Sequence, residues 1–294
     1  MRMRPMVEKL ETVSGAITVL VDNTIMELVP DSDFVKRLSK PPANFLAEHG
    51  FSVLIEIGVK KILVDTGATG IALKHNLALL GLSFDDIDLI FLSHGHYDHT
   101  GGLPAATGKV LAHHDAFCER FLVPKPGVSI DVSGPALRGD NHSLEYQKGP
   151  VKLAEGVITT GEIHRVHDWE ELPIFRIKKN DVEELDRVWD DQAVVINSEH
   201  GLVIVAGCSH AGIVNTIKHA MNITGLSKIY CVIGGFHLIG PGEAKIDRTI
   251  QELKKINIEK IVPIHCTGFE ATKRLSTEME KQFEYCTTGC RMEF

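Results

Sequence analysis

Hydrophobic residues along the chain gather in short continuous runs, each bounded by polar residues, glycine or proline. A short run that is apolar throughout predicts a strand buried on both faces. We expect strands at residues 16–21, 51–57, 61–64, 89–92, 109–112, 193–197, 202–206, 228–233 and 258–264. Two pairs of these runs lie close enough together to form hairpins, one turned at Gly58 and one at His200–Gly201.

Other segments space their apolar residues as helices do. In residues 243–256, for example, Ile246, Ile250 and Leu253 fall on one stripe of an amphipathic helix. We expect helices at residues 71–80, 213–221, 243–256 and 269–283. The stretch between the first strand and the first hairpin holds three prolines and is expected to be mostly loop, and residues 286–294 are expected to be a short tail.

The pattern weakens from residue 113 to about residue 187. Prolines interrupt this stretch, and charged residues are dense between positions 162 and 184. Long irregular segments in compact domains are often functional. We interpret residues 113–190, approximately, as an insertion, a lid or a region that packs on a partner subunit.

The two halves of the chain resemble each other, since each has a hairpin followed by strands that alternate with helices. In both halves polar clusters follow the strand ends. This order predicts an α/β fold and a single domain over residues 1–294, an αββα sandwich of two stacked mixed sheets with helices outside. Ligands from both halves would then meet along one edge of the sandwich.

The candidate chemistry follows the buried strand at residues 89–92. His94, His96, Asp98 and His99 come within six positions of one another. In extended chain, positions i and i+2 point the same way, so His94 and His96 can hold one ion together. Asp98 and His99 follow as the chain turns and can face a second ion. Imidazole is a favoured zinc ligand, so this string predicts a metal site.

Composition limits the class of protein. The apolar content of 44% and the charged content of 24% are those of a soluble globular protein. A net charge of −8 disfavours a nucleic-acid partner, and no apolar run is long enough to span a membrane. The six cysteines form no CxxC pair, which favours reduced thiols in the cytoplasm. We expect a small-molecule substrate and, as the commonest assembly, a homodimer.

The order of these motifs resembles the metallo-β-lactamase fold superfamily. Asp65-Thr66-Gly67 follows a strand, HxHxDH comes next, and further histidines follow later strands. Finer motifs are DN at 22–23, HG at 49–50, GCSHAG at 207–212, GGFHL at 234–238 and HCTG at 265–268. These are similar to the branch of 7,8-dihydropterin-6-yl-methyl-4-(β-D-ribofuranosyl)aminobenzene 5'-phosphate synthase-like proteins.

The resemblance implies two ion positions. His94 and His96 would hold the first ion, and Asp98, His99 and the strand-end His265 would hold the second. The superfamily's bridging aspartate is replaced here by Cys208, and its third histidine, expected near residues 159–162, is absent. We therefore expect His210 to complete the ligand set of the first ion. Cys208 is expected to be either a thiolate ligand or a packed thiol.

Four further residues have predicted roles around the ions. His237, at another strand end, is a candidate general acid or a structural residue. Asp65 is expected to orient a ligand histidine, since metal-bound imidazoles usually donate their other N–H to a carboxylate. His49 and Asn23 are weaker candidates for contacts with substrate.

Three functions fit these residues. The first is a hydrolase acting on a small phosphorylated or ester-containing metabolite. One or two divalent ions would supply a hydroxide that Asp98 orients, and we expect Zn²⁺ rather than Fe or Mn. The second follows the branch: a transferase that joins an activated dihydropterin to an arylamine with loss of diphosphate. The third is a non-haem iron redox protein. Flavodiiron relatives, however, carry a carboxylate at the position of His96.

Overall fold

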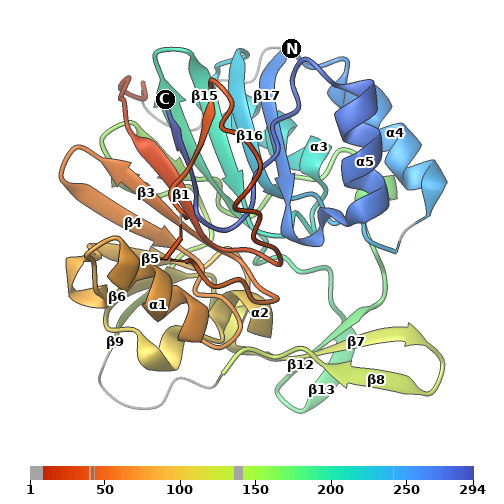
Figure 1. Ribbon diagram of the computed structural model, residues 1–294. Coiled ribbons are helices and arrows are strands. Elements are labelled where there is room, and N and C mark those ends of the chain that lie inside the picture. Colours follow the sequence, from red (N-terminus) through yellow and green to blue (C-terminus); the bar gives the residue numbers. More distant parts are fainter. Residues whose placement is uncertain (1–8, 40, 43, 136–141, 241) are drawn as a thin grey trace.

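The computed structural model describes residues 9–39, 41–42, 44–135, 142–240 and 242–294. Two sheets stack face to face, with helices on their outer sides (Figure 1). This is the α/β sandwich expected from the sequence. Among the described residues, no helix combines the length and apolarity needed to cross a bilayer.

The first sheet has eight strands in the order β2-β18-β1-β3-β4-β5-β6-β9. They are β1 (Ala16–Val21), β2 (Val35–Arg37), β3 (Ser52–Ile57), β4 (Lys60–Val64), β5 (Leu89–Phe91), β6 (Gly108–Ala112), β9 (His142–Tyr146) and β18 (Cys290–Glu293). The sheet is mixed, because β1, β3 and β4 pair antiparallel whereas β4, β5, β6 and β9 pair parallel.

The second sheet has six strands in the order β10-β11-β14-β15-β16-β17. They are β10 (Lys152–Ala154), β11 (Val157–Thr159), β14 (Ala193–Ser198), β15 (Gly201–Ala206), β16 (Ile229–Gly235) and β17 (Ile258–Ile264). Strands β15, β16 and β17 are parallel, so their carboxyl ends reach the same edge. Both hairpins expected from the sequence, β3–β4 and β14–β15, are present.

The irregular region contains strands that the sequence pattern does not reveal. Strands β7 (Glu119–Lys125), β8 (Val128–Asp131), β12 (Phe175–Lys179) and β13 (Val182–Leu185) form a small third sheet, which extends from the sandwich (Figure 1). Strands β9, β10 and β11 of the same region extend the two main sheets. The region where the sequence pattern weakens is therefore largely strand, and its interpretation as an insertion, a lid or a partner contact stays a prediction. These strands were missed because most of their side chains are polar and exposed, as in the fully exposed β13.

Helices cover the outer faces of the two main sheets. The α-helices are α1 (Ile71–Leu79), α2 (Tyr97–Thr100), α3 (Ile213–Thr224), α4 (Glu243–Leu253) and α5 (Phe269–Glu278). Short 3₁₀ turns are η1 (Phe84–Asp86), η2 (Leu103–Ala105), η3 (His114–Phe117), η4 (Asp168–Glu170) and η5 (His265–Thr267). One apolar cluster fills the space between the sheets, and two others lie under α1 and under α3, α4 and α5.

Three expectations about the chain ends and loops need correction. The tail at 286–294 is not loose, because β18 pairs with both β1 and β2 inside the first sheet. The last helix ends at Glu278 rather than at residue 283. The segment after β1 is mostly loop as expected, but it contributes the short strand β2.

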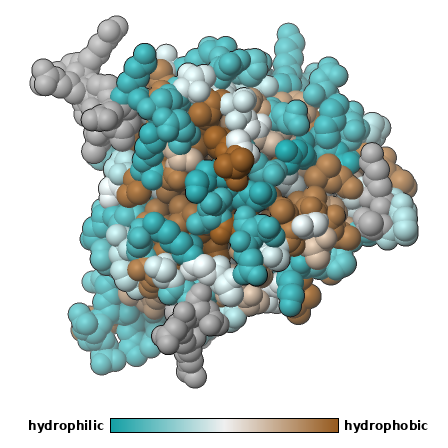
Figure 2. Space-filling view, turned by 90° about the vertical axis from the view of Figure 1, so that its left-hand side faces the viewer, coloured by the Kyte–Doolittle hydropathy of each residue, from teal (hydrophilic) through white to brown (hydrophobic). Residues whose placement is uncertain are grey.

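The surface mixes hydrophilic and hydrophobic residues. On the face shown in Figure 2, brown and teal residues are interleaved. Single exposed apolar side chains such as Val59, at the turn between β3 and β4, are ordinary in folded proteins.

Candidate metal centre

The candidate ligands lie where strands of the two main sheets end. The ligand segments follow β5, β15 and β17, and Asp65 and His237 follow β4 and β16. Four residues at these ends, Asp65, Ser209, His237 and His265, have positive φ angles of 60°, 55°, 46° and 53° although none is glycine. Such backbone costs energy and clusters at functional sites, where the surrounding fold enforces it.

One group of ligands comprises His94, His96 and His210. His94 Nε2 lies 3.1 Å from His96 Nδ1, and the His210 ring centroid lies 4.8 Å and 4.7 Å from those of His94 and His96. Burial holds the pKa of all three imidazoles well below its ordinary value, and neighbouring cations reinforce this effect. The three rings are therefore neutral at pH 7, the form that binds metals.

A second group comprises Asp98, His99, Cys208 and His265, whose ligand atoms all lie within 4.8 Å of one another. His99 Nε2 lies 3.0 Å from Cys208 Sγ and 3.2 Å from His265 Nε2, and Asp98 Oδ2 lies 3.4 Å from that same nitrogen. Burial opposes the charge on Asp98, but the imidazoles of His99 and His265 outweigh burial and hold the pKa of this carboxyl well below its ordinary range.

These donors fit divalent cations. His210 Nε2 is buried and has no hydrogen-bond partner, and such an orphaned atom is costly in a folded protein. His99 Nε2 faces both Cys208 Sγ, at 3.0 Å, and His265 Nε2, at 3.2 Å, a convergence of donor atoms that suits a shared cation. One or two ions would satisfy both groups with the nitrogen, oxygen and sulfur donors that zinc and related metals prefer.

Asp65 lies behind the ligands. Its Oδ2 is 2.7 Å from His99 Nδ1, and its two oxygens accept hydrogen bonds from the backbone N–H and the hydroxyl of Ser93. The Ser93 hydroxyl is in turn 3.0 Å from His94 Nδ1. The carboxylate is completely buried. This contact is the one that the sequence analysis predicts for Asp65, and it fixes which nitrogen of His99 faces the centre.

Cys208 occupies a central position. Its Sγ belongs to the second group, to a set with His94 and His210, and to a third set with His237 and Cys266. The sequence analysis did not single out Cys266. Its Sγ lies 3.5 Å from the Cys208 carbonyl oxygen, and its position beside His265 was the available signal. His237 is half-buried, its ring centroid lies 4.2 Å from that of His210, and its Nδ1 has no partner.

The two predicted substrate contacts lie beside the second group. His49 Nε2 is 3.5 Å from Asp98 Oδ2, and its side chain is 61% exposed. Asn23 is exposed, but its amide is engaged: Nδ2 donates to the His265 carbonyl, and Oδ1 accepts from the Gly50 N–H and faces His265 Nδ1. His49 stays a candidate for contact with substrate, whereas the Asn23 amide is engaged with His265.

A segment before β14 ties the ligand loops together, which the sequence analysis missed. Asp190 Oδ2 accepts a 2.8 Å hydrogen bond from the Gly95 N–H, between the first two ligand histidines. Asp191 Oδ2 accepts one of the same length from the Ala211 N–H, next to His210. Arg120, from β7, donates to Asp190 at 2.7 Å and to Asp186 at 2.8 Å. The third sheet is thus anchored to the centre.

Phe175 brings the third sheet against the ligands. Its ring centroid lies 5.1 Å from that of His96, 5.0 Å from that of His210 and 6.0 Å from that of His237. Phe175 is buried on β12. The third sheet therefore places an apolar side chain over the first group of ligands, where it excludes water.

Comparisons with known proteins agree with this geometry. The family model of the metallo-beta-lactamase superfamily matches residues 47–208. The 7,8-dihydropterin-6-methyl-4-(beta-D-ribofuranosyl)-aminobenzene-5'-phosphate synthase of Methanocaldococcus jannaschii is 36% identical over 85% of this chain and 91% of its own length. An uncharacterised protein of the same organism is 34% identical over 88% of this chain and 93% of its length.

Solved structures lead to the same fold. A metal-dependent hydrolase of the beta-lactamase superfamily superposes with a TM-score of 0.75 and 26% identity, over 95% of this chain and 99% of its own. The metallo-beta-lactamase fold protein YhfI of Bacillus subtilis superposes with a TM-score of 0.53 and 14% identity, over 96% and 100%. The second likeness concerns the fold alone.

Proposed function

The chain belongs to the metallo-beta-lactamase superfamily, and from that premise we propose that it is a metal-dependent transferase joining a dihydropterin to an arylamine. A C–N bond forms between the methylene carbon of the dihydropterin and the amine nitrogen. The C–O bond to a diphosphate breaks, and the amine loses a proton. The 36% identity to a synthase named for such a product, over most of both chains, supports this proposal.

The charge of the ligand set is the observation that carries the proposal. Five of its members are imidazoles, and the only carboxylate among them is that of Asp98. The position between the two groups holds the thiol of Cys208 in place of a second carboxylate. When bound, divalent ions would stabilise negative charge on oxygen as Lewis acids. The anionic members of the set would be Asp98 and a metal-bound Cys208 thiolate, so two divalent ions would still keep an excess of positive charge, which suits a diphosphate.

A cavity of about 320 Å³ adjoins the second group and is suited to a flat ring. Asn23 and His265 lie on one side of it, and Ile239, Phe269 and Tyr285 provide apolar and aromatic walls. Phe269 is 78% exposed and Ile239 is 60% exposed, which is unusual for side chains of this size next to a buried centre. A dihydropterin ring would cover both.

The remaining residues have roles in orientation and proton transfer. The half-buried imidazole of His237, beside His210, is our candidate to accept the proton that the amine releases. His49 lies beside Asp98 at the exposed side, where it can contact substrate. Phe175 keeps water from the first group of ligands, which limits hydrolysis of the activated dihydropterin.

A hydrolase is the second candidate, favoured by the likeness to a metal-dependent hydrolase over nearly the whole of both chains. In that reaction water takes the place of the arylamine, and the same residues bind and orient the phosphate-bearing substrate. His237 would then protonate the leaving group rather than accept a proton.

Release of diphosphate distinguishes the two reactions. Metal-loaded protein would be incubated with the diphosphate ester of hydroxymethyl-dihydropterin, with and without an arylamine such as 4-aminobenzoate. The transferase is supported if diphosphate appears only with the amine and the coupled product is found by mass spectrometry. Equal release without the amine would contradict it and support the hydrolase.

A further inference from the structure

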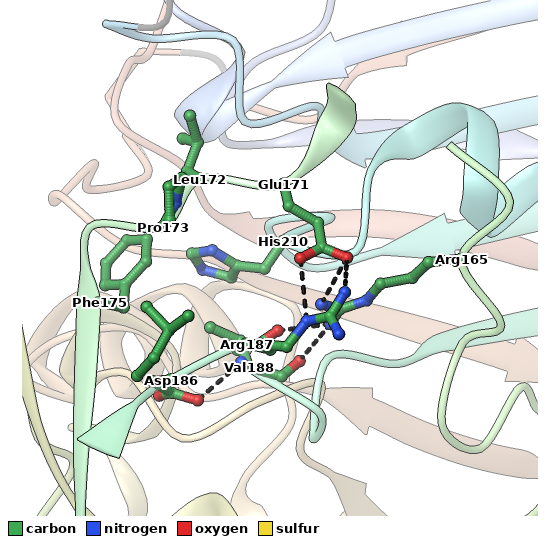
Figure 3. A pocket seen from close by; sticks show the side chains of 10 residues that line it. Arg165, Glu171, Leu172, Pro173, Phe175, Asp186, Arg187, Val188 and His210 are labelled. Atoms are coloured by element: carbon green, nitrogen blue, oxygen red, sulfur yellow. Dashed lines mark hydrogen bonds and ion pairs between the residues drawn. The ribbon is translucent and has the colours of Figure 1, made fainter. Parts of the chain in front are cut away.

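We propose that Arg165 and Arg187 form an oxyanion subsite beside the metal centre that takes a terminal phosphate monoester of the substrate. The subsite faces the same cavity as His210, a candidate ligand of the first ion. Figure 3 shows the Glu171 carboxylate directed at both guanidiniums, with the His210 imidazole and the Phe175 ring on another side of the cavity. Glu171 occupies the position of the phosphate when no substrate is bound.

The contacts of Glu171 resemble those that arginines make to phosphate. Arg187 Nε donates to Glu171 Oε2 at 3.0 Å, and Arg187 Nη2 donates to Oε1, so the pair is bidentate. Arg165 Nη1 lies 3.5 Å from that same Oε1. A planar guanidinium makes such paired contacts to carboxylates and to phosphates alike. The two guanidiniums therefore already hold an oxyanion, the Glu171 carboxylate, whose place a phosphate would take.

Arg165 has donors that the protein does not use. Its side chain is only 4% exposed, and its Nε and Nη1 are buried without a hydrogen-bond acceptor. Its Nη2 donates to the backbone carbonyls of Arg187 and Val188. Buried donors without acceptors are rare and costly, and a missing ligand is one of the few explanations for them. Nε, which has no partner, and Nη1, which has only the long ion pair with Glu171, would hold two phosphate oxygens.

The surroundings keep both guanidiniums in place. The ring of Trp189 lies 4.6 Å from the Arg165 guanidinium carbon and 4.9 Å from that of Arg187, which orders both side chains before any ligand arrives. Val188, between Arg187 and Trp189 in sequence, has a φ angle of 51°, a strained conformation for a β-branched residue. Strain of this kind clusters at ligand clamps.

Two other carboxylates near the subsite have partners of their own. The Asp186 carboxylate, on the same cavity wall, is paired with Arg120, and buried Asp191 accepts the Ala211 N–H. Glu171 is thus the carboxylate that directly pairs with both arginines. A dianionic phosphate would bring one more negative charge to the two guanidiniums than the Glu171 carboxylate does. This favours phosphate over the resident glutamate.

This inference rests on the proposed function for the identity of the substrate, an arylamine that carries a ribose 5-phosphate. The subsite would hold that phosphate while the amine faces the centre next to His210. Binding at the subsite, however, does not depend on turnover, so it can be tested separately.

The test is calorimetric titration of the metal-loaded protein with ribose 5-phosphate and, for comparison, with ribose. We expect ribose not to bind, and Arg187→Gln to weaken ribose 5-phosphate binding by ~10-fold or more, the loss for a charge-assisted hydrogen bond. Glu171→Gln removes the competing carboxylate and should tighten binding several-fold. Arg291→Gln, in which the lost partner is Glu56 on the first sheet, is the matched control and should leave binding unchanged.

Arg165→Lys keeps the charge but removes the planar fork, so it should weaken binding without unfolding the protein. The proposal is overturned if Arg187→Gln binds as tightly as the parent protein or if Glu171→Gln does not tighten binding, since the phosphate would then lie on the metal ions. If the substitutions change ribose 5-phosphate binding as expected but diphosphate release does not require the amine, only the proposed function is contradicted. If diphosphate release requires the amine but the substitutions leave ribose 5-phosphate binding unchanged, only the subsite is contradicted.

Discussion

Replacing Arg120 by methionine should destabilise the protein strongly, because this buried guanidinium holds the third sheet on the metal centre. Arg120 and Asp190 are completely buried and Asp186 is 3% exposed. Methionine fills a similar volume but makes none of the ion pairs. Both carboxylates would then remain buried without their cation, although Asp190 would keep the Gly95 N–H.

Removing one partner of a buried ion pair typically costs about 3–5 kcal/mol. Two charge-assisted hydrogen bonds, at 2.8 Å and 2.7 Å, are lost together with a third to the Asp115 carbonyl at 2.9 Å, which places Arg120→Met within that range. For a chain of 294 residues this corresponds to a fall in melting temperature of about 5–8 °C. The free energy of unfolding would be measured by urea denaturation of the metal-loaded protein.

The control is Arg291→Met, because Arg291 is 30% exposed and its ion pair is solvated. It should cost no more than about 1 kcal/mol. The reasoning also predicts that Arg120→Met lowers metal content, since Asp190, which accepts the Gly95 N–H between His94 and His96, would lose the guanidinium that positions it. A variant with the parent protein's stability and metal content would refute the anchoring role of Arg120.

Further substitutions test other parts of the account. Cys208→Ser should lower the bound metal measured by elemental analysis, whereas Cys231→Ser, in the core between the sheets, should leave it unchanged. Asp65→Asn should weaken metal affinity about 10–100-fold in a chelator competition, because His99 loses the carboxylate that orients it. Burial raises the pKa of Glu170 from 4.5 to about 7, so the folded protein binds this proton more tightly than the unfolded chain. The resulting stabilisation is complete below pH 4.5 and is lost as the pH rises through 7. Melting temperatures of Glu170→Gln, measured over this pH range, should lack the part of the pH dependence that Glu170 causes. A variant with the same pH profile as the parent protein would contradict this prediction.

The strands of the two main sheets could be predicted where both of their faces are covered. Continuous apolar runs such as those of β1 and β15 have no other common explanation in a soluble chain. Strands of the third sheet have one or both faces in solvent, so their sequence carries no comparable signal. The last strand, β18, is four residues long, too short for its alternation of buried and accessible residues to stand out.

The candidate ligands could be predicted because their residue types are chemically distinctive and follow strand ends. The structure brings His94, His96 and His210 together, and likewise Asp98, His99 and His265. The network of Arg120 and Asp190 could not be predicted, since a salt bridge across 70 positions depends on tertiary packing alone. The cytoplasmic location, the homodimer and the roles of the site residues stay predictions.

The central claim is that imidazoles from both halves of the chain hold shared cations at the edge of the two sheets. Metal content of the purified His94→Ala/His96→Ala variant tests it most directly, with His114→Ala/His200→Ala, at two exposed positions, as the matched control. The account predicts that the control keeps the metal content of the parent protein and that the His94/His96 variant loses at least one ion per chain. A His94/His96 variant with its full complement of zinc, iron or manganese would contradict the account.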